Sequence, residues 1–174
     1  MKRSSIARPA LAFLLACLFL SSCKKDDEVV NNTAATKFNW ITAGNWKQKD
    51  LVLAYPIEFA GSDLPVGFSL YNITGYLPVS GPLIDCTKDN TYSFKSDSSY
   101  AITGCTELML PGAGNAGKWR LEVHNAVLRL MAPSSEGSPY WTNTLTENEW
   151  SLGMTIYIAE ADANLPVNLI IEKQ

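Results

Sequence analysis

Side chains that could do nucleophilic or acid–base chemistry are sparse in this 174-residue sequence. His124 is the one histidine, so any Ser-His-Asp or Cys-His arrangement must use it. It stands beside Asn125 between two predicted strands, and no Gly-x-Ser-x-Gly motif presents a nucleophile. We therefore interpret His124 as a surface turn residue and not as a catalytic base.

Carboxylates offer another route to catalysis. Asp50, Asp85 and Glu122 could supply the acid–base pair of a glycosidase, but their spacing selects no pair, and Glu122 falls on the outward face of its predicted strand. Asp85, Asp89 and Asn90 offer oxygen ligands for calcium, yet their spacing does not match a calcium loop and a turn explains them. The sequence thus predicts a protein that is not an enzyme and holds no metal or cofactor.

The clearest chemical motif lies at the N-terminus. Three basic residues precede an apolar run of about ten residues, whereas a helix that crosses a membrane needs roughly 20. Leu20-Ser21-Ser22-Cys23 then places two small residues before a cysteine whose thiol can be acylated. This tetrapeptide is similar to a bacterial lipobox. We expect residues 1–22 to be a signal peptide that is removed, and Cys23 to carry lipid such as palmitate.

The segment after Cys23 predicts where the lipid anchor sends the chain. Residues 24–28, Lys-Lys-Asp-Asp-Glu, resemble the export signal that sends lipoproteins of the Bacteroidetes to the outer face of the outer membrane. The alternative is a solvated start to a tether. Residues 23–39 are then the lipidated cysteine and a flexible tether, and residues 40–174 the folded domain. After residue 22 the chain has 11 basic and 17 acidic residues and no basic patch, which argues against nucleic acid as a partner.

Two cysteines remain for the folded domain. Cys17 leaves with the signal peptide and Cys23 takes the lipid, so Cys86 and Cys105 have one intramolecular pairing available. A disulfide is the default for such a pair in an oxidising exported compartment. A zinc site is disfavoured, because the chain offers one histidine and only these two thiols.

The folded part has the sequence pattern of an all-β protein: short alternating or apolar runs separated by the turn-forming residues Gly, Pro, Asn, Asp and Ser. Residues 118–123 are the clearest case, with Trp119, Leu121 and Val123 on one face. Eight strands are predicted, at residues 45–53, 91–94, 99–103, 118–123, 127–130, 140–146, 151–158 and 168–173. Eight antiparallel strands of modest length can close into an up-and-down barrel.

Residues 54–85 interrupt this pattern. Their repeated prolines and glycines predict a long excursion with a short extra hairpin near residues 68–76, not core strands. Long segments on a rigid scaffold often carry function.

Two sets of residues carry a family resemblance. Gly44-Asn45-Trp46 matches the Gly-x-Trp that opens the first strand of lipocalins, where the tryptophan plugs the closed end of the barrel. Residues 85–94, Ser99-Tyr100, Cys105 and residues 117–121 form a series similar to the lipocalin-like domain of small Bacteroidetes lipoproteins. The resemblance covers residues 40–174 and implies a lipocalin-like antiparallel β-barrel.

Aromatic residues on the predicted strands are the most suggestive set for binding. If Trp46 points inward, period two places Gln48 and Asp50 inward as well, and a polar group beside an apolar calyx orients a ligand. A bulge after Trp46 would instead turn both to solvent, and rings that simply fill the barrel are the other alternative. The candidates for ligand contact are Trp46, Gln48, Asp50, Tyr92, Phe94, Tyr100, Trp119 and Trp141.

These patterns favour a membrane-anchored, surface-exposed lipoprotein whose lipocalin-like barrel binds a small apolar or amphipathic ligand. The alternative is a module with a solid core that contacts a glycan or a protein partner through residues 54–85. A cavity inside the barrel would separate the two.

Overall fold

The computed structural model describes residues 34–105, 110 and 112–174, and these belong to one compact unit, Thr33–Gln174. The expected signal peptide, the lipidated Cys23 and residues 24–33 of the expected tether lie outside the described residues. Within the described part, no helix has the length and apolar character needed to span a bilayer.

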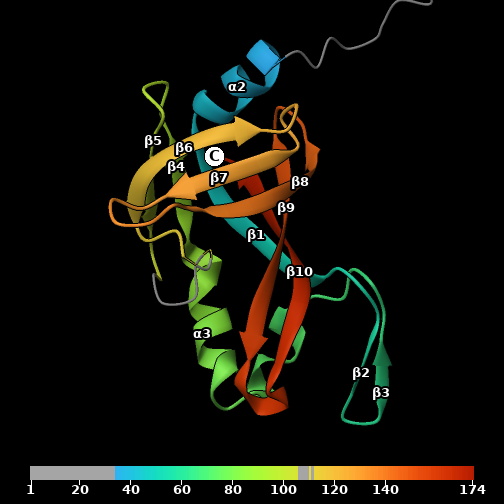
Figure 1. Ribbon diagram of the computed structural model, residues 1–174. Coiled ribbons are helices and arrows are strands. Elements are labelled where there is room, and N and C mark those ends of the chain that lie inside the picture. The colour runs from blue at the N-terminus through green and yellow to red at the C-terminus, as the bar shows by residue number, and fades with distance from the viewer. Residues whose placement is uncertain (1–33, 106–109, 111) are drawn as a thin grey trace, which may run out of the picture. The chain divides into compact units, whose positions relative to one another are not determined.

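Eight antiparallel strands close into a barrel, as the sequence predicts (Figure 1). Around the barrel their order is β1, β10, β9, β8, β7, β6, β5 and β4, and β4 pairs with β1 to close it. Neighbours in the chain are neighbours in the barrel, so the topology is up-and-down. The strands are β1 (Asn45–Leu53), β4 (Thr91–Phe94), β5 (Ser99–Thr103), β6 (Ala116–Glu122), β7 (Val127–Met131), β8 (Ser138–Leu145), β9 (Glu149–Ile158) and β10 (Ala163–Lys173).

Alternation of side chains fixes the inner face of the barrel. Tyr92 and Phe94 of β4 and Tyr100 and Ile102 of β5 are buried, as the predicted hairpin requires. The alternation predicted for β6 ends one residue early, because Val123 has a φ of 47° and lies exposed in the turn. Placing Val123 on the inner face with Trp119 was therefore wrong.

Three tryptophans form the centre of the core. Trp46 and Trp150 are fully buried and meet edge to face, with ring centroids 6.0 Å apart. The ring of Phe94 lies 5.5 Å from Trp150 and 5.6 Å from Trp119, which joins the three indoles into one cluster. Each such pair contributes about 0.5–1.5 kcal/mol beyond the area it buries.

Helix α2 (Ala34–Thr42) replaces part of the predicted tether. Phe38 stacks on Trp119 at 5.4 Å, and the buried Ile41 accepts a hydrogen bond from the Trp46 indole at 3.0 Å. A tether over residues 34–39 was therefore wrong: Phe38, Trp40 and Ile41 pack this short helix onto the barrel.

The excursion predicted at residues 54–85 extends to residue 89 and contains different elements. A separate hairpin pairs β2 (Ile57–Phe59) with β3 (Ser62–Leu64), and the chain then forms short helices. The hairpin expected at residues 68–76 was wrong, since that stretch contains two 3₁₀ turns. The short helices are η1 (Leu70–Asn72), η2 (Thr74–Tyr76), α3 (Ser80–Cys86) and η3 (Thr87–Asp89).

The predicted disulfide joins the end of α3 to the segment after β5. Cys86 and Cys105 are bonded, with their Cα atoms 5.4 Å apart. The bond ties the helical part of the excursion to the barrel, because Cys86 is the last residue of α3 and Cys105 follows β5 (Figure 1).

Replacing both cysteines by serine should lower the free energy of unfolding of residues 33–174 by roughly 3 kcal/mol, because the unfolded chain gains the freedom of an open loop. Urea unfolding followed by fluorescence measures this. A reducing agent should destabilise the parent protein and leave the double variant unchanged. An unfolding midpoint of the parent that does not respond to reduction would contradict the structural role of the bond.

Candidate binding site

Gln48 lies at the centre of a buried polar network inside the barrel. Its Oε1 accepts hydrogen bonds from the Tyr92 hydroxyl at 2.7 Å and from Asn90 Nδ2 at 3.2 Å. Its Nε2 donates to the Tyr71 hydroxyl and to Thr87 Oγ1, both at 2.7 Å. These four bonds use both donors and both acceptor sites of the amide. Gln48 therefore binds the excursion to the barrel.

The Tyr92 and Tyr71 hydroxyls are the titratable groups of this network. Burial raises the pKa of both phenols above its ordinary value, and most strongly that of Tyr92. Both therefore stay neutral and serve as hydrogen-bonding groups.

Asp50 does not share the inner face with Gln48. The register of β1 against β10 shifts between these two residues, so the strand bulges at Lys49. The Asp50 carboxylate is half-buried and accepts hydrogen bonds from Ser69 Oγ at 2.6 Å and from the Leu51 amide at 2.7 Å. Period two was therefore right for Gln48 and wrong for Asp50, because the bulge turns Asp50 toward the excursion.

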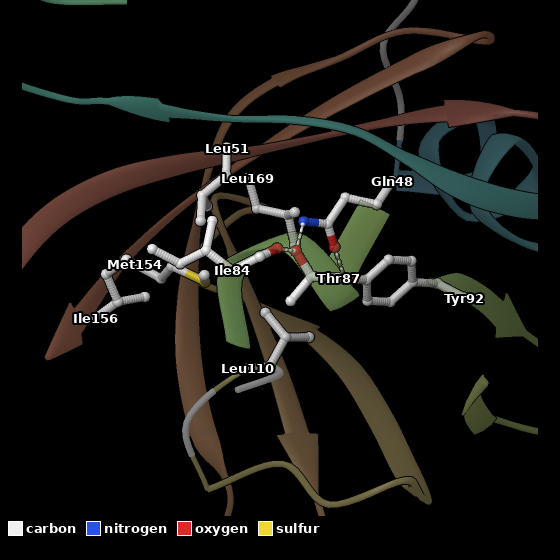
Figure 2. A pocket seen from close by; sticks show the side chains of 9 residues that line it. All are labelled: Gln48, Leu51, Ile84, Thr87, Tyr92, Leu110, Met154, Ile156 and Leu169. Carbon is white, nitrogen blue, oxygen red and sulfur yellow. Dashed lines mark hydrogen bonds between the residues drawn. The ribbon is translucent and has the colours of Figure 1, made fainter. Parts of the chain in front are cut away.

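The barrel interior is packed. A cavity of about 10 Å³, enough for roughly one water molecule, lies beside Gln48. Figure 2 shows the side chains that close it, which come from β1, α3, η3, β4, β9, β10 and, for Leu110, the segment between β5 and β6, and converge on the same small space. Its lining residues are Gln48, Leu51, Ile84, Thr87, Tyr92, Leu110, Met154, Ile156 and Leu169.

Most of the predicted ligand contacts are core residues. Trp46, Tyr92, Phe94, Tyr100 and Trp119 are all buried, and the structure brings them together as packing side chains. The Tyr100 hydroxyl donates to the carbonyl oxygen of Ala113, and the Trp119 indole donates to the carbonyl oxygen of Lys95 at 3.1 Å. These rings fill the interior and satisfy their own polar atoms there.

Trp141 is separated from this set. It is 60 % exposed and lies on the outer face of β8, so it does not line the barrel interior.

A larger hollow lies outside the barrel, between the excursion and the tip of the β9–β10 hairpin. We call it the apolar groove; its volume is about 230 Å³. Three elements contribute walls: the β2–β3 hairpin, the 3₁₀ turns η1 and η2, and the chain from Ile158 to Leu165. Its lining residues are Ile57, Glu58, Phe59, Leu70, Ile73, Leu77, Ile158, Ala161, Ala163 and Leu165.

The β2–β3 wall depends on a tight turn. Ala60 and Gly61 connect the two strands with φ values of 50° and 77°, the left-handed pair of a two-residue type I′ turn. This turn pairs Ile57 with Leu64, and Ile57 and Phe59 then lie on the groove. Sequence reasoning missed this hairpin because alanine is rarely found at the first of these positions.

A carboxylate from the other wall holds the excursion in place. Glu160 Oε1 accepts hydrogen bonds from the backbone amides of Val79 at 2.6 Å and Ser80 at 2.9 Å, where α3 begins. In return, Ser80 Oγ accepts a hydrogen bond from the Ala159 amide at 3.0 Å. Desolvation opposes the charge of Glu160, but the bonds from Ser80 and Val79 outweigh it and lower its pKa to about 2.

The candidate catalytic carboxylates are separated and paired. Lys88, at 2.6 Å, holds the pKa of Asp85 below its ordinary value. Arg129, at 2.9 Å, does the same for Glu122. A general acid needs a raised pKa near neutrality, so neither carboxyl is suited to that role. His124 lies in the exposed turn between β6 and β7, with a φ of 55°.

Glu160→Gln should weaken the contact between α3 and the hairpin tip at neutral pH. A carboxylate whose folded pKa of about 2 lies below its ordinary 4.5 stabilises the fold above pH 4.5, and this contribution is lost as the pH falls toward 2. The unfolding midpoints of the parent and the variant should therefore differ at pH 7 and converge near pH 2. Glu136→Gln, at an exposed loop position, is the matched control. A difference between the two midpoints that persists at pH 2 would contradict the stabilising role assigned to the Glu160 carboxylate.

The comparisons with known proteins give no match: no family model fits this chain, and no curated protein matches its sequence.

Proposed function

We propose that this chain is a lipid-anchored lipoprotein of a bacterial outer membrane, facing the cell exterior, whose lipocalin-like domain binds a small apolar or amphipathic ligand without catalysis. We place the ligand in the apolar groove and not inside the barrel. The observation that carries this placement is the contrast in volume, about 230 Å³ in the groove against about 10 Å³ inside the barrel.

The lining of the apolar groove supports an aliphatic or aromatic ligand. Leu70, Ile73 and Leu77 form a buried floor, and Leu165 and Phe59 are half-buried beside it. Burying apolar ligand surface here contributes about 25 cal/mol per Å². The volume is slightly below the roughly 300–1,000 Å³ of typical ligand pockets, which favours a small molecule.

Glu58 gives the groove its polar group. It is the one charged residue among the described residues that line the groove, and its side chain is exposed. A negative charge at the rim disfavours an anionic ligand. The groove therefore fits a neutral or cationic amphipathic molecule better than a fatty acid anion.

The second candidate function is the interaction module. Four large apolar side chains of the excursion are exposed, namely those of Tyr55, Val66, Tyr76 and Val79. Such side chains, gathered in one segment, can form a contact surface for a glycan or a protein. This reading needs no occupant in the apolar groove, so the experiment below separates the two.

The lipid anchor is supported by the sequence motif around Cys23. One acyl chain gives only reversible attachment, so stable anchoring needs two or more. The residues between Cys23 and helix α2 would then act as a tether that lets the barrel bind ligands away from the bilayer.

Filling the apolar groove should abolish ligand binding. Ala161→Trp places an indole in the groove from an exposed position and leaves the core of the barrel intact. We expect the affinity of residues 33–174 for N-phenyl-1-naphthylamine to fall about tenfold or more, measured by the fluorescence of this apolar probe.

Ala34→Trp, at an exposed position of α2, is the matched control and should bind like the parent. Probe binding that survives Ala161→Trp would place the ligand elsewhere. If the parent does not bind the probe either, the interaction module is the better account.

Cys23→Ala should abolish lipid attachment. Cells that express the parent and are fed an alkyne analogue of palmitate should label the protein, and cells that express the variant should not. Proteinase K added to intact cells should digest the labelled parent protein if it faces the exterior. Labelling that persists without Cys23 would contradict the anchor, and protection from the protease would contradict the outward orientation.

A further inference from the structure

A second hollow lies on the outer face of the barrel, separate from the apolar groove. It extends across β8, β9 and β10 to the residues that follow β1, and its volume is about 480 Å³. We call it the aromatic groove, because Trp141 of β8 and Tyr55 after β1 both line it. Their side chains are 60 % and 66 % exposed. Such exposure of two large rings on one hollow indicates a binding surface.

The floor of the aromatic groove is flat because of a glycine. Gly153 of β9 lies between Trp141 on β8 and Asn168 on β10 in the same row of the sheet. A Cβ at this position would come within 3.1 Å of Asn143 Nδ2. The absence of a side chain lets Asn143 reach across β9, where its Nδ2 donates to Asn168 Oδ1 at 2.7 Å.

Asn143 lies on the same outer face as Trp141, because the two residues are two positions apart on β8. The register of β8 against β9 shifts between Thr142 and Thr144, so Asn143 is the extra residue of a bulge. The bond between Asn143 and Asn168 uses one N–H and one lone pair, and each amide has two N–H groups and a carbonyl oxygen. Both amides therefore keep donors and acceptors for a ligand.

The chemistry of this lining points to one class of ligand. Its polar side chains are neutral: the two amides, the Tyr55 hydroxyl and the Thr155 hydroxyl. A charged ligand would find no ionic partner among the residues that line it. A sugar ring has an apolar C–H face that packs on the negative face of an aromatic ring, and a rim of hydroxyls that amides bond in pairs.

We propose that the aromatic groove binds a neutral oligosaccharide, with Trp141 and Tyr55 stacked on sugar rings at its two ends and the Asn143–Asn168 pair bonding hydroxyls between them. The groove spans several strands, so it accommodates a chain of sugars and not a single one. This site is independent of the apolar groove, and either can fail without the other.

The test uses the full mature chain in phosphatidylcholine nanodiscs, which avoid the sugar head groups of common detergents. The probes are neutral hexasaccharides of glucose, mannose, galactose and N-acetylglucosamine, titrated to millimolar concentration. We expect at least one to bind by calorimetry and to shift the fluorescence emission of the exposed Trp141 to shorter wavelength. The parent should not bind charged uronic acid hexasaccharides.

Variants locate the binding. Trp141→Ala should weaken the affinity about tenfold or more, whereas Trp141→Phe should retain most of it. Gly153→Val should also weaken binding, since it displaces the amide of Asn143. Tyr157→Ala removes an aromatic ring that is 52 % exposed on β9 outside this lining, so it should have no effect.

Two outcomes would overturn the proposal: none of the four neutral sugars binds, or binding is unchanged by both Trp141→Ala and Gly153→Val. Circular dichroism of each variant confirms that it is folded.

Discussion

An eight-stranded barrel is only wide enough for its own side chains or for one small ligand, and this chain uses that space for side chains. Trp46 and Trp150 contact each other in it at 6.0 Å, and Phe94 joins Trp150 to Trp119 at 5.5 and 5.6 Å. Gln48 fills more of it and makes four hydrogen bonds there. Because interiors pack nearly as densely as crystals, little space remains for a ligand beside these groups.

A filled barrel moves the possible sites to its outer surface. The excursion over residues 54–89 is held there by contacts of different kinds, which together fix its position. Ser69 bonds Asp50, Tyr71 and Thr87 bond Gln48, and Glu160 bonds the backbone where α3 begins. Held at these points, the excursion faces the β9–β10 hairpin and leaves the apolar groove between them.

Much of the barrel could be predicted from the sequence, because alternation and turn residues act locally. The strands at Asn45–Leu53, Thr91–Phe94 and Ser99–Thr103 match their predicted bounds, and the Cys86–Cys105 bond followed from counting cysteines. Alternation could not predict the bulge that turns Asp50 away from Gln48, since a bulge depends on the partner strand.

The candidate site was much less accessible to sequence reasoning. Whether aromatic rings fill a barrel or line a ligand cavity depends on how side chains from distant strands interdigitate. The alternation of residues along a single strand does not determine this. Helix α2 was missed because it depends on the packing of Phe38 against Trp119, two residues that are 81 positions apart in the sequence. The β2–β3 hairpin was missed because Ala60 occupies a position at which glycine or asparagine is usual.

The most direct test of a filled barrel with an external ligand site is the set of nuclear Overhauser contacts between bound N-phenyl-1-naphthylamine and the methyl groups of residues 33–174. We expect contacts from the probe to Ile57, Leu70 and Leu165 in the apolar groove. Contacts instead to Leu51, Leu128 and Leu169, which are buried in the barrel core, would contradict this account.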